Sequence, residues 1–397
     1  MMTLSAFASI DEKPLPAGVD QRHEQAILTD LGLALGQAAA GWTPVWAGVS
    51  AERSANMAYI AKNEEITNQY AVVTRGTDFA MPIDILEDFG VQKTAQFPAG
   101  GRVVQIAEGT SEAHDLLIEA VGNDGYTLLE ELASRVGTDG DGSTIFVTGH
   151  SLGGALATTV ALYLQTALPD ACFQVYTFAA PTAGLTDFAG LYDQTFPGNG
   201  PGANSSWRVC NIWDVVPQAW QASTLGDILS WYPPPGPSQS SQVNLILRHV
   251  IGLPGDLPYQ QPSTNVAQLN NPCWPDAVRD PQPDFLTETG FQHDCNTYLT
   301  LLGAPTVSVL SSVAPNVLRR GADSTTLKLT GLGFSDQTTA SFSNGGIIVR
   351  SRVPHSQNKL SVTVSVADDA PLGSCDVILT SENGERIPGG TRSLLVL

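Results

Sequence analysis

The chain has 397 residues, of which 42% are hydrophobic and 15% charged, so it can bury a sizeable core and is long enough for two or three domains. Its formal net charge of -20 disfavours the binding of nucleic acid or of anionic lipid headgroups. No apolar run reaches the roughly 18 residues of a transmembrane helix, and residues 1–20 lack a signal-peptide core. The sequence therefore predicts a soluble protein, with the cytoplasm as its default compartment.

The first half of the chain alternates between predicted helices and predicted strands. The expected helices are 21–39, 110–120 and 126–135, and the expected strands are 56–62 and 68–74. The second strand leads directly into Arg75-Gly76-Thr77. Because strands that alternate with helices form parallel sheets, we expect a largely parallel sheet covered on both faces, an α/β fold.

Directly after Thr77, residues 78–89 are unusually apolar for a loop. The apolar positions that stand out are Phe79, Met81, Ile83 and Leu86. Side chains of this kind are not left in solvent without a function, so the segment is expected to cover another surface of the protein.

Residues 144–148 form a β-branched and aromatic run that ends in Gly149-His150-Ser151-Leu152-Gly153. Apolar residues or Thr then recur with helical spacing up to residue 164. This order predicts a strand, a sharp turn and a helix, with a serine in the turn and glycines where a Cβ would not fit. Ser151 is therefore the candidate nucleophile. In a glycine-rich chain the pentapeptide alone is weak evidence, so the prediction depends on the strand before it and the helix after it.

A serine nucleophile needs a base and an acid, and on this kind of sheet the order along the chain is Ser, Asp, His. Asp214 directly follows the predicted strand 207–213 and is the candidate acid; its alternative role is to cap a turn. His293 lies in a polar break before a helical run at 296–302. We favour it as the base over His249, which lies among aliphatic residues and is typical of a histidine at the edge of a core.

The five cysteines follow no spacing typical of a metal site, and no metal is expected. Cys172 and Cys210 fall in predicted buried strands, where cysteine commonly acts as a small apolar residue. Cys273 and Cys295 would be able to pair in an oxidising compartment. Because the number of cysteines is odd, at least one thiol stays free.

From about residue 305 the pattern changes to short alternating runs rich in Val, Thr and Ser, separated by turn residues such as Asn344-Gly345. The seven predicted strands are 307–313, 325–330, 338–342, 347–350, 360–366, 375–380 and 393–397. This number and spacing predict a β-sandwich that begins after Gly303-Ala304-Pro305. His355 is expected at its surface.

Several of these segments resemble the class 3 lipases, the group that includes the filamentous-fungal triacylglycerol lipases. The resemblance covers about residues 20–303. The motifs that carry it are Arg75-Gly76-Thr77, Gly149–Leu156, Tyr176–Gly184, Asn211–Pro217 and Gln292-His293 with Tyr298. Further along, residues 329–334 and 370–384 resemble the IPT/TIG branch of the immunoglobulin-like domains.

The resemblance implies an α/β-hydrolase fold with an oxyanion hole made by Thr77, through its backbone N–H and hydroxyl, and by the backbone N–H of Leu152. A helix N-terminus suits Leu152, because unpaired donors and the helix dipole there favour negative charge. It also implies that residues 78–89 are a lid over the acyl groove; the alternative is a helix packed permanently on the core.

The chain also departs from the family pattern. Thr74 replaces the aromatic residue usual before Arg-Gly-Thr, and residues 105–109 replace a His-x-Gly-Phe segment. The stretch between Asp214 and His293 is long for the family. Residues 218–288 are therefore expected to be either an added cap that faces the substrate or ordinary loop packing.

The sequence thus predicts a hydrolase domain at 1–303 and an immunoglobulin-like domain at 304–397 that contributes placement and no chemistry. The expected activity is hydrolysis of carboxylic esters, above all acylglycerols at a lipid–water interface, without a cofactor. The alternatives are a phospholipase or a short-chain esterase with the same residues, and a catalytically silent binding protein. The partner of the immunoglobulin-like domain is unknown, and secretion by a signal-independent route is the alternative to the cytoplasm.

Overall fold

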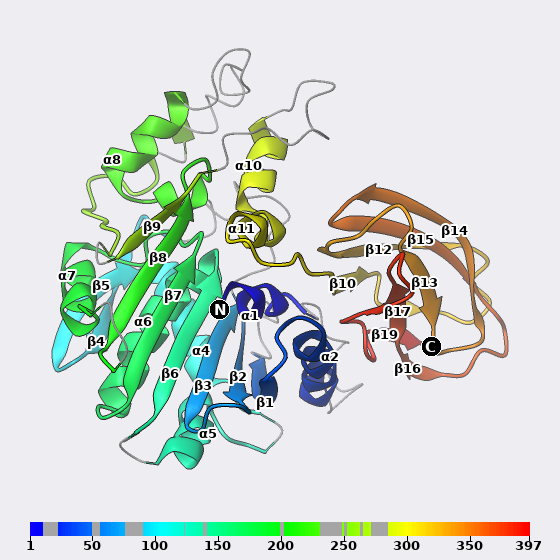
Figure 1. The fold of residues 1–397 in the computed structure, drawn as a ribbon. Coiled ribbons are helices and arrows are strands. Elements are labelled where there is room, and N and C mark those ends of the chain that lie inside the picture. The colour runs from blue at the N-terminus through cyan, green and yellow to red at the C-terminus, as the bar shows by residue number, and fades with distance from the viewer. Residues whose placement is uncertain are drawn as a thin grey trace.

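The structure is a computed structural model with a central seven-stranded sheet in its N-terminal part and an all-β part at its C-terminal end (Figure 1). It describes residues 1–10, 23–49, 56–75, 90–122, 124–137, 140, 142–198, 202–230, 248–249, 252–262, 265–270 and 285–397. The α/β-hydrolase type of fold that the sequence predicted, followed by an all-β part, is confirmed.

The strands of the central sheet follow the order β1-β2-β3-β6-β7-β8-β9. β1 (Trp42–Val49), β2 (Met57–Asn63) and β3 (Gln69–Arg75) pair antiparallel. From β3 onward every pairing is parallel, through β6 (Thr144–His150), β7 (Cys172–Phe178), β8 (Ser205–Asn211) and β9 (Val266–Leu269). The carboxyl ends of the parallel strands therefore meet at one edge of the sheet, where the loops after β6 and β8 lie next to each other.

Helices cover both faces of this sheet. The described helices of the chain are α1 (Met2–Phe7), α2 (His23–Ala38), α4 (Glu108–Glu119), α5 (Leu128–Val136), α6 (Leu152–Ala167), α7 (Thr186–Thr195), α8 (Ala222–Leu225), α10 (Phe285–His293) and α11 (Cys295–Leu301). Short 3-10 helices span Val216–Gln218 and Gly226–Ser230, and a separate hairpin is formed by β4 (Thr94–Ala99) and β5 (Arg102–Ala107). Among the described helices, none is both long and apolar enough to cross a membrane.

Alternate residues of the central strands point to opposite faces, and each face is buried in its own core. On one face, Ile60 and Val72 belong to the core that includes α4, α6 and α7. On the other, Tyr59 and Val73 belong to a second core with α1, α2 and α11. This burial on both faces explains why the strands read as nearly continuous apolar runs.

The N-terminal segment that contains α1 is buried, which the sequence pattern did not predict. The hydroxyl of Tyr59 donates to the carbonyl of Leu4 at 2.7 Å. The guanidinium of Arg75 donates to the carbonyls of Ala8 and Ile10 at 3.2 and 2.9 Å. Arg75, the last residue of β3, therefore binds the N-terminal segment to the carboxyl end of this strand. Arg75 stands immediately before the residues expected to form the oxyanion loop.

The stretch at 218–288, expected as a cap or as loop packing, is described only in part. Val266–Leu269 of this stretch is β9, the edge strand of the central sheet, and Trp220 is fully buried in the core that also contains residues of α6 and α7. These two parts of the stretch belong to the α/β fold, and the cap and the loop packing both stay predictions for the stretch as a whole. Cys273, whose pairing with Cys295 was considered, lies outside the described residues.

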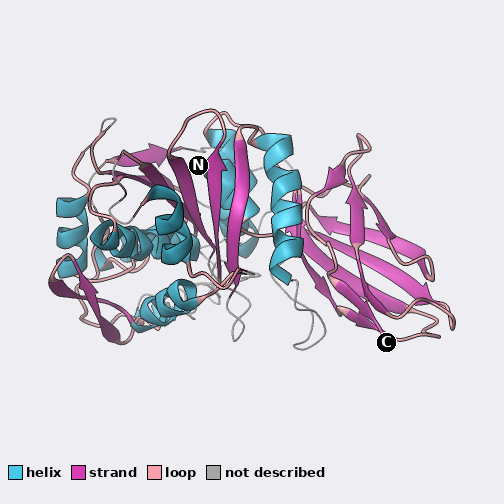
Figure 2. Cartoon of the chain, turned by 90° about the horizontal axis from the view of Figure 1, so that it is seen from below, coloured by secondary structure: helices cyan, strands magenta, loops and turns pink. Residues whose placement is uncertain are grey.

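The C-terminal part consists of short strands around one apolar core (Figure 2). The strands are β10 (Val309–Ala314), β11 (Val317–Leu318), β12 (Thr325–Leu332), β13 (Thr339–Phe342), β14 (Ile347–Ser356), β15 (Lys359–Val366), β16 (Gly373–Cys375), β17 (Val377–Thr380), β18 (Arg386–Ile387) and β19 (Leu394–Val396). Four of them form the sheet β10-β12-β15-β14, and the rest form two three-stranded sheets. β14 is longer than the predicted strand 347–350 because it pairs with β15 along its whole length.

The two parts of the chain are in close contact. Val307, Val309 and Leu332 of the C-terminal part lie in the same core as α1 and α2. The buried carboxylate of Asp30 on α2 accepts hydrogen bonds from the backbone N–H and the hydroxyl of Thr391, at 2.9 and 2.6 Å. A domain boundary after Gly303 stays a prediction, and these contacts cross it.

Candidate active site

Ser151 lies in a sharp turn between β6 and α6 and has a φ of +59°, in the left-handed region that is costly for a residue with a side chain. Its backbone N–H donates to the carbonyl of Phe178 on β7 at 2.9 Å. A Cβ at Gly149 would lie 2.2 Å from the carbonyl oxygen of Gly153, and a Cβ at Gly154 would lie 2.7 Å from the Cβ of Ala180. Glycine is therefore required at positions 149 and 154, and of the two glycines of the pentapeptide this confirms the prediction for Gly149.

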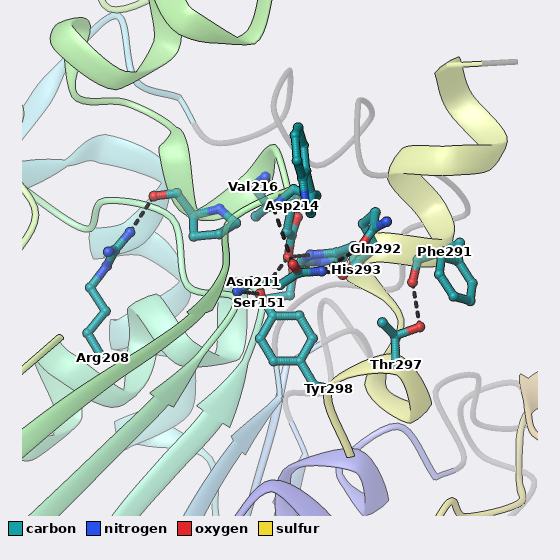
Figure 3. A network of polar contacts seen from close by, with 12 residues as sticks. Ser151, Arg208, Asn211, Asp214, Val216, Phe291, Gln292, His293, Thr297 and Tyr298 are labelled. Carbon is teal, nitrogen blue, oxygen red and sulfur yellow. Dashed lines mark hydrogen bonds and ion pairs between the residues drawn. The ribbon is translucent and has the colours of Figure 1, made fainter. Parts of the chain in front are cut away.

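His293 is the last residue of α10 and lies between two polar partners (Figure 3). Its Nε2 is 2.9 Å from Oγ of Ser151, and its Nδ1 is 2.8 Å from Oδ2 of Asp214. The ring is buried, with 7% of the residue exposed. The structure thus brings together three side chains that lie far apart in the sequence but that the motif order had placed in one site.

Asp214 follows β8 and is fully buried. Its Oδ1 accepts the backbone N–H of Val216 at 3.0 Å, and its Oδ2 accepts both His293 and the hydroxyl of Tyr298, the latter at 2.9 Å. The oxygen of the same hydroxyl accepts the backbone N–H of Asn211 at 2.9 Å. These donors stabilise the fully buried carboxylate.

The contact of Tyr298 with Asp214 was not predicted, although Tyr298 stands in the histidine motif. Burial raises the pKa of Tyr298 well above its ordinary value, with a further contribution from the nearby carboxylate of Asp214. Its hydroxyl therefore stays protonated at neutral pH and acts as a donor to Asp214. The only signal in the sequence was a tyrosine one turn into the helix that follows His293.

A second set of bonds fixes the end of α10 to the end of β8. The side-chain amide of Asn211 donates to the carbonyl oxygen of Gln292 at 3.1 Å and to its Oε1 at 2.6 Å. Nε2 of Gln292 donates in turn to Oε1 of Glu288 at 2.7 Å. The residue directly before His293 is thus attached to the strand that carries Asp214.

The ring of His150 lies against that of His293, with 4.7 Å between the ring centroids. Burial lowers the pKa of His150 well below its ordinary value, and the nearby His293 lowers it further. His150 is therefore neutral at physiological pH and places no fixed positive charge beside the ring of His293.

The remaining residues expected at the site have different outcomes. Leu152 is the first residue of α6, so its backbone N–H belongs to the first turn, where a helix offers no acceptor. Thr77 and the four apolar residues Phe79, Met81, Ile83 and Leu86 lie outside the described residues, as does the whole segment 78–89. His249 and His355 are exposed, and Nε2 of His355 contacts the hydroxyl of Ser361 at 2.8 Å. In the described part of the chain, no group of three or more His, Cys, Asp or Glu side chains is arranged to hold a metal.

Comparison with known proteins relates this site to a family of hydrolases. Residues 71–223, which carry Ser151 and Asp214, match the family model of the class 3 lipases. This stretch of the α/β part is therefore similar to the class 3 lipases, as the sequence motifs indicated. The chain is accordingly a carboxylic ester hydrolase. Residues 307–387, in the all-β part, match the model for domain III of the alpha subunit of quinohemoprotein amine dehydrogenase.

One solved structure supports the fold of the α/β part. The crystal structure of M37 lipase is 24% identical and superposes with a TM-score of 0.64, covering 76% of this chain and 91% of that one. Two further lipase structures are more distant. Lipase II from Rhizopus niveus is 20% identical with a TM-score of 0.37, covering 48% of this chain and 65% of that one. Lip2 lipase from Yarrowia lipolytica is 19% identical with a TM-score of 0.40, covering 55% of this chain and 72% of that one. No curated protein gave a significant match.

Proposed function

We propose that this protein is a triacylglycerol lipase that uses Ser151, His293 and Asp214 as a catalytic triad. The observation that carries the proposal is the continuous line of hydrogen bonds from Oγ of Ser151 through both ring nitrogens of His293 to Asp214, at 2.9 and 2.8 Å (Figure 3). These are the distances at which an imidazole accepts a hydroxyl proton while its other nitrogen is held by a carboxylate.

In the first half of the reaction, Nε2 of His293 takes the proton of Ser151 as Oγ attacks the carbonyl carbon of the ester. The carbonyl oxygen becomes an oxyanion, which the backbone N–H of Leu152 stabilises together with Thr77. The role of Thr77 is taken from the resemblance to the class 3 lipases. When the tetrahedral species collapses, the bond to the alcohol oxygen breaks. His293 gives its proton to that oxygen, and the acyl group stays on Ser151.

In the second half, a water molecule loses a proton to His293 and attacks the acyl carbon. The bond to Oγ of Ser151 breaks, the proton returns from His293 to Oγ, and the carboxylic acid leaves. Asp214 stays ionised throughout and stabilises the imidazolium that forms twice in each cycle. Tyr298 and Val216 support this role by donating to Asp214, because a buried charged group needs hydrogen-bond donors in place of water.

The proposed substrate is an acylglycerol. The net charge of -20 supports a neutral ester over a phospholipid with an anionic headgroup. We further propose that residues 78–89 form the lid and that Phe79, Met81, Ile83 and Leu86 face the acyl chain, since their apolar character suits a segment that alternates between protein and lipid.

The experiment is to measure hydrolysis of tributyrin, triolein and phosphatidylcholine, each below and above its solubility limit, with the Ser151→Ala variant as the blank. A triacylglycerol lipase should cleave emulsified triolein, and its rate on tributyrin should rise sharply above the solubility limit. Preference for phosphatidylcholine, or activity confined to dissolved short esters, would replace the proposed substrate by one of the two alternatives. Equal rates for Ser151→Ala and the native chain would contradict the proposed mechanism.

A further inference from the structure

Asp294, the residue that follows His293, lies between α10 and α11. Asp294 has an extended backbone (φ -63°, ψ 139°), which ends α10 at His293 and starts α11 at Cys295. Its Oδ1 accepts the backbone N–H of Asn296 at 2.8 Å and so caps α11. The orientation of the His293 ring depends on this corner, because the backbone of His293 continues directly into it.

The second carboxylate oxygen of Asp294 is bound by the C-terminal part of the chain. Nδ2 of Asn358 donates to Oδ2 of Asp294 at 2.8 Å. Asn358 lies in the turn between β14 and β15, and this turn is itself fixed. The carbonyl of Asn358 accepts the backbone N–H of Gly331 at 3.1 Å, and the carbonyl of Gln357 accepts that of Phe334 at 2.7 Å.

The neighbouring contacts make this junction rigid. Asn296 of α11 exchanges two hydrogen bonds with Val307: its Nδ2 donates to the carbonyl at 2.9 Å, and its Oδ1 accepts the N–H at 2.8 Å. The hydroxyl of Thr297 donates to the carbonyl of Phe291 at 2.6 Å, which joins α11 to the last turn of α10. A displacement of α11 would therefore also move His293, because the two are joined by the hydrogen bond of Thr297 to α10 and by the backbone between the two helices.

Asp294 is 7% exposed, so an ionised carboxylate there needs donors. Burial raises the pKa of Asp294, while hydrogen bonds, first of all that from Asn358, oppose the increase. Without Asn358 the carboxylate would have to find another donor, take up a proton or move. Each of these outcomes changes the corner that follows His293.

We infer that Asn358, through its bond to Asp294, is a positioning residue for the general base His293. The C-terminal part of the chain thus helps to build the active site, in addition to the placement expected from the sequence. The role of His293 as base comes from the proposed function, on which this inference rests. Asn358 itself touches no reacting atom.

The test exchanges donor and acceptor across this bond. Asn358→Asp places two carboxylates against each other, and Asp294→Asn places two amides there. The double variant Asp294→Asn/Asn358→Asp restores one donor and one acceptor. Turnover of soluble p-nitrophenyl butyrate is measured per folded molecule. We expect each single variant to lower kcat by about tenfold with little change in KM, and the exchange to recover most of the loss.

A readout that does not depend on turnover is the proton NMR signal of the ring N–H that joins His293 to Asp214. We expect it to shift or exchange faster in the single variants and to return in the double variant. The matched control is Thr391→Val, which removes a side-chain bond to Asp30 across the same contact region but away from His293. It should leave kcat and the ring signal unchanged.

These readouts separate failure of the inference from failure of the proposed function. Single variants with native kcat and a native ring signal would overturn the inference while leaving an active lipase. Losses that the double variant does not recover would also overturn it, because they would not come from the Asn358–Asp294 bond. If the native chain hydrolysed no ester, the proposed function would fail, and a ring signal that is lost and then restored would still support the coupling.

Discussion

At the scale of single residues, the side chain most in need of a test is Tyr298, which contacts Asp214 but was not assigned a role from the sequence. Tyr298→Phe removes the donor to Oδ2 of Asp214 and leaves the buried N–H of Asn211 without its acceptor. We expect kcat on a soluble ester to fall by about tenfold and the protein to lose about 1–3 kcal/mol of stability.

The matched control is Tyr192→Phe. Tyr192 is also fully buried, and its hydroxyl lies 2.8 Å from that of Ser206, remote from the triad. The control should show a comparable decrease in thermal stability with native kcat. Equal effects of the two substitutions on kcat would contradict a specific role for Tyr298.

His114 gives a second prediction at this scale. It is buried beside Thr159, and burial lowers its pKa from 6.5 to about 4. Between these two pH values the unfolded chain binds a proton that the folded chain does not, so the free energy of unfolding should decrease as the pH falls below 6.5. The slope is about 1.4 kcal/mol per pH unit for one proton, and the full contribution is present above pH 6.5.

Denaturant unfolding of the native chain and of His114→Gln at several pH values between 4 and 7 measures this slope, with the exposed His355→Gln as the control. In the His114 variant, the slope of the free energy of unfolding against pH should be smaller by the contribution of about one proton. An unchanged slope would show that the ring is protonated in the folded state.

At the scale of elements, the turn between β6 and α6 depends on glycine for space. Gly154→Ala would bring a Cβ within 2.7 Å of Ala180 and 3.1 Å of the carbonyl of Phe178. Because neither neighbour is the end of a flexible side chain, we expect a loss of about 1–3 kcal/mol together with reduced turnover.

Gly190→Ala is the matched control, since a Cβ at this helical position in α7 meets nothing within 4 Å. It should be neutral or stabilising by about 0.5–1 kcal/mol. Thermal unfolding of the two variants separates the effects. A Gly154→Ala protein as stable and active as the native chain would mean that the turn is looser than the structure indicates.

The same scale shows what the sequence pattern was able to predict. β6 and α6 were predicted because the periodicity of apolar residues and the positions of glycines are properties of the local sequence. The residues named for the triad followed from the order of the motifs along the chain. β1 was missed because Pro44 and the register shift after it interrupt the strand pattern. The contacts of Tyr298 and Asn358 were beyond reach, since each joins residues that only the tertiary fold brings together.

At the scale of the whole molecule, the structure leads us to revise one expectation. The sequence favoured a C-terminal part that contributes placement and no chemistry, so that its removal leaves most of the turnover of a soluble ester. Truncation after Gly303 would uncover the core that α1 and α2 share with Val309 and Leu332, and would remove the donor to Asp30. We therefore expect a markedly lower thermal midpoint and a tendency to aggregate, measured by calorimetry and light scattering.

A truncated chain that stays monomeric and unfolds at the native temperature would contradict this expectation. It would also support the original view of a separable domain that contributes placement alone. The full-length chain under the same buffer conditions is the reference for both measurements.

The central claim is that Ser151 is a nucleophile activated by His293. The most direct measurement is the intact mass and peptide map of the full-length protein after reaction with a fluorophosphonate, compared with the Ser151→Ala and His293→Ala variants. We predict one adduct on Ser151 in the native chain, none in Ser151→Ala, and labelling that is slower by a factor on the order of a thousand or more in His293→Ala. An adduct on another residue, or native labelling rates without His293, would contradict the account.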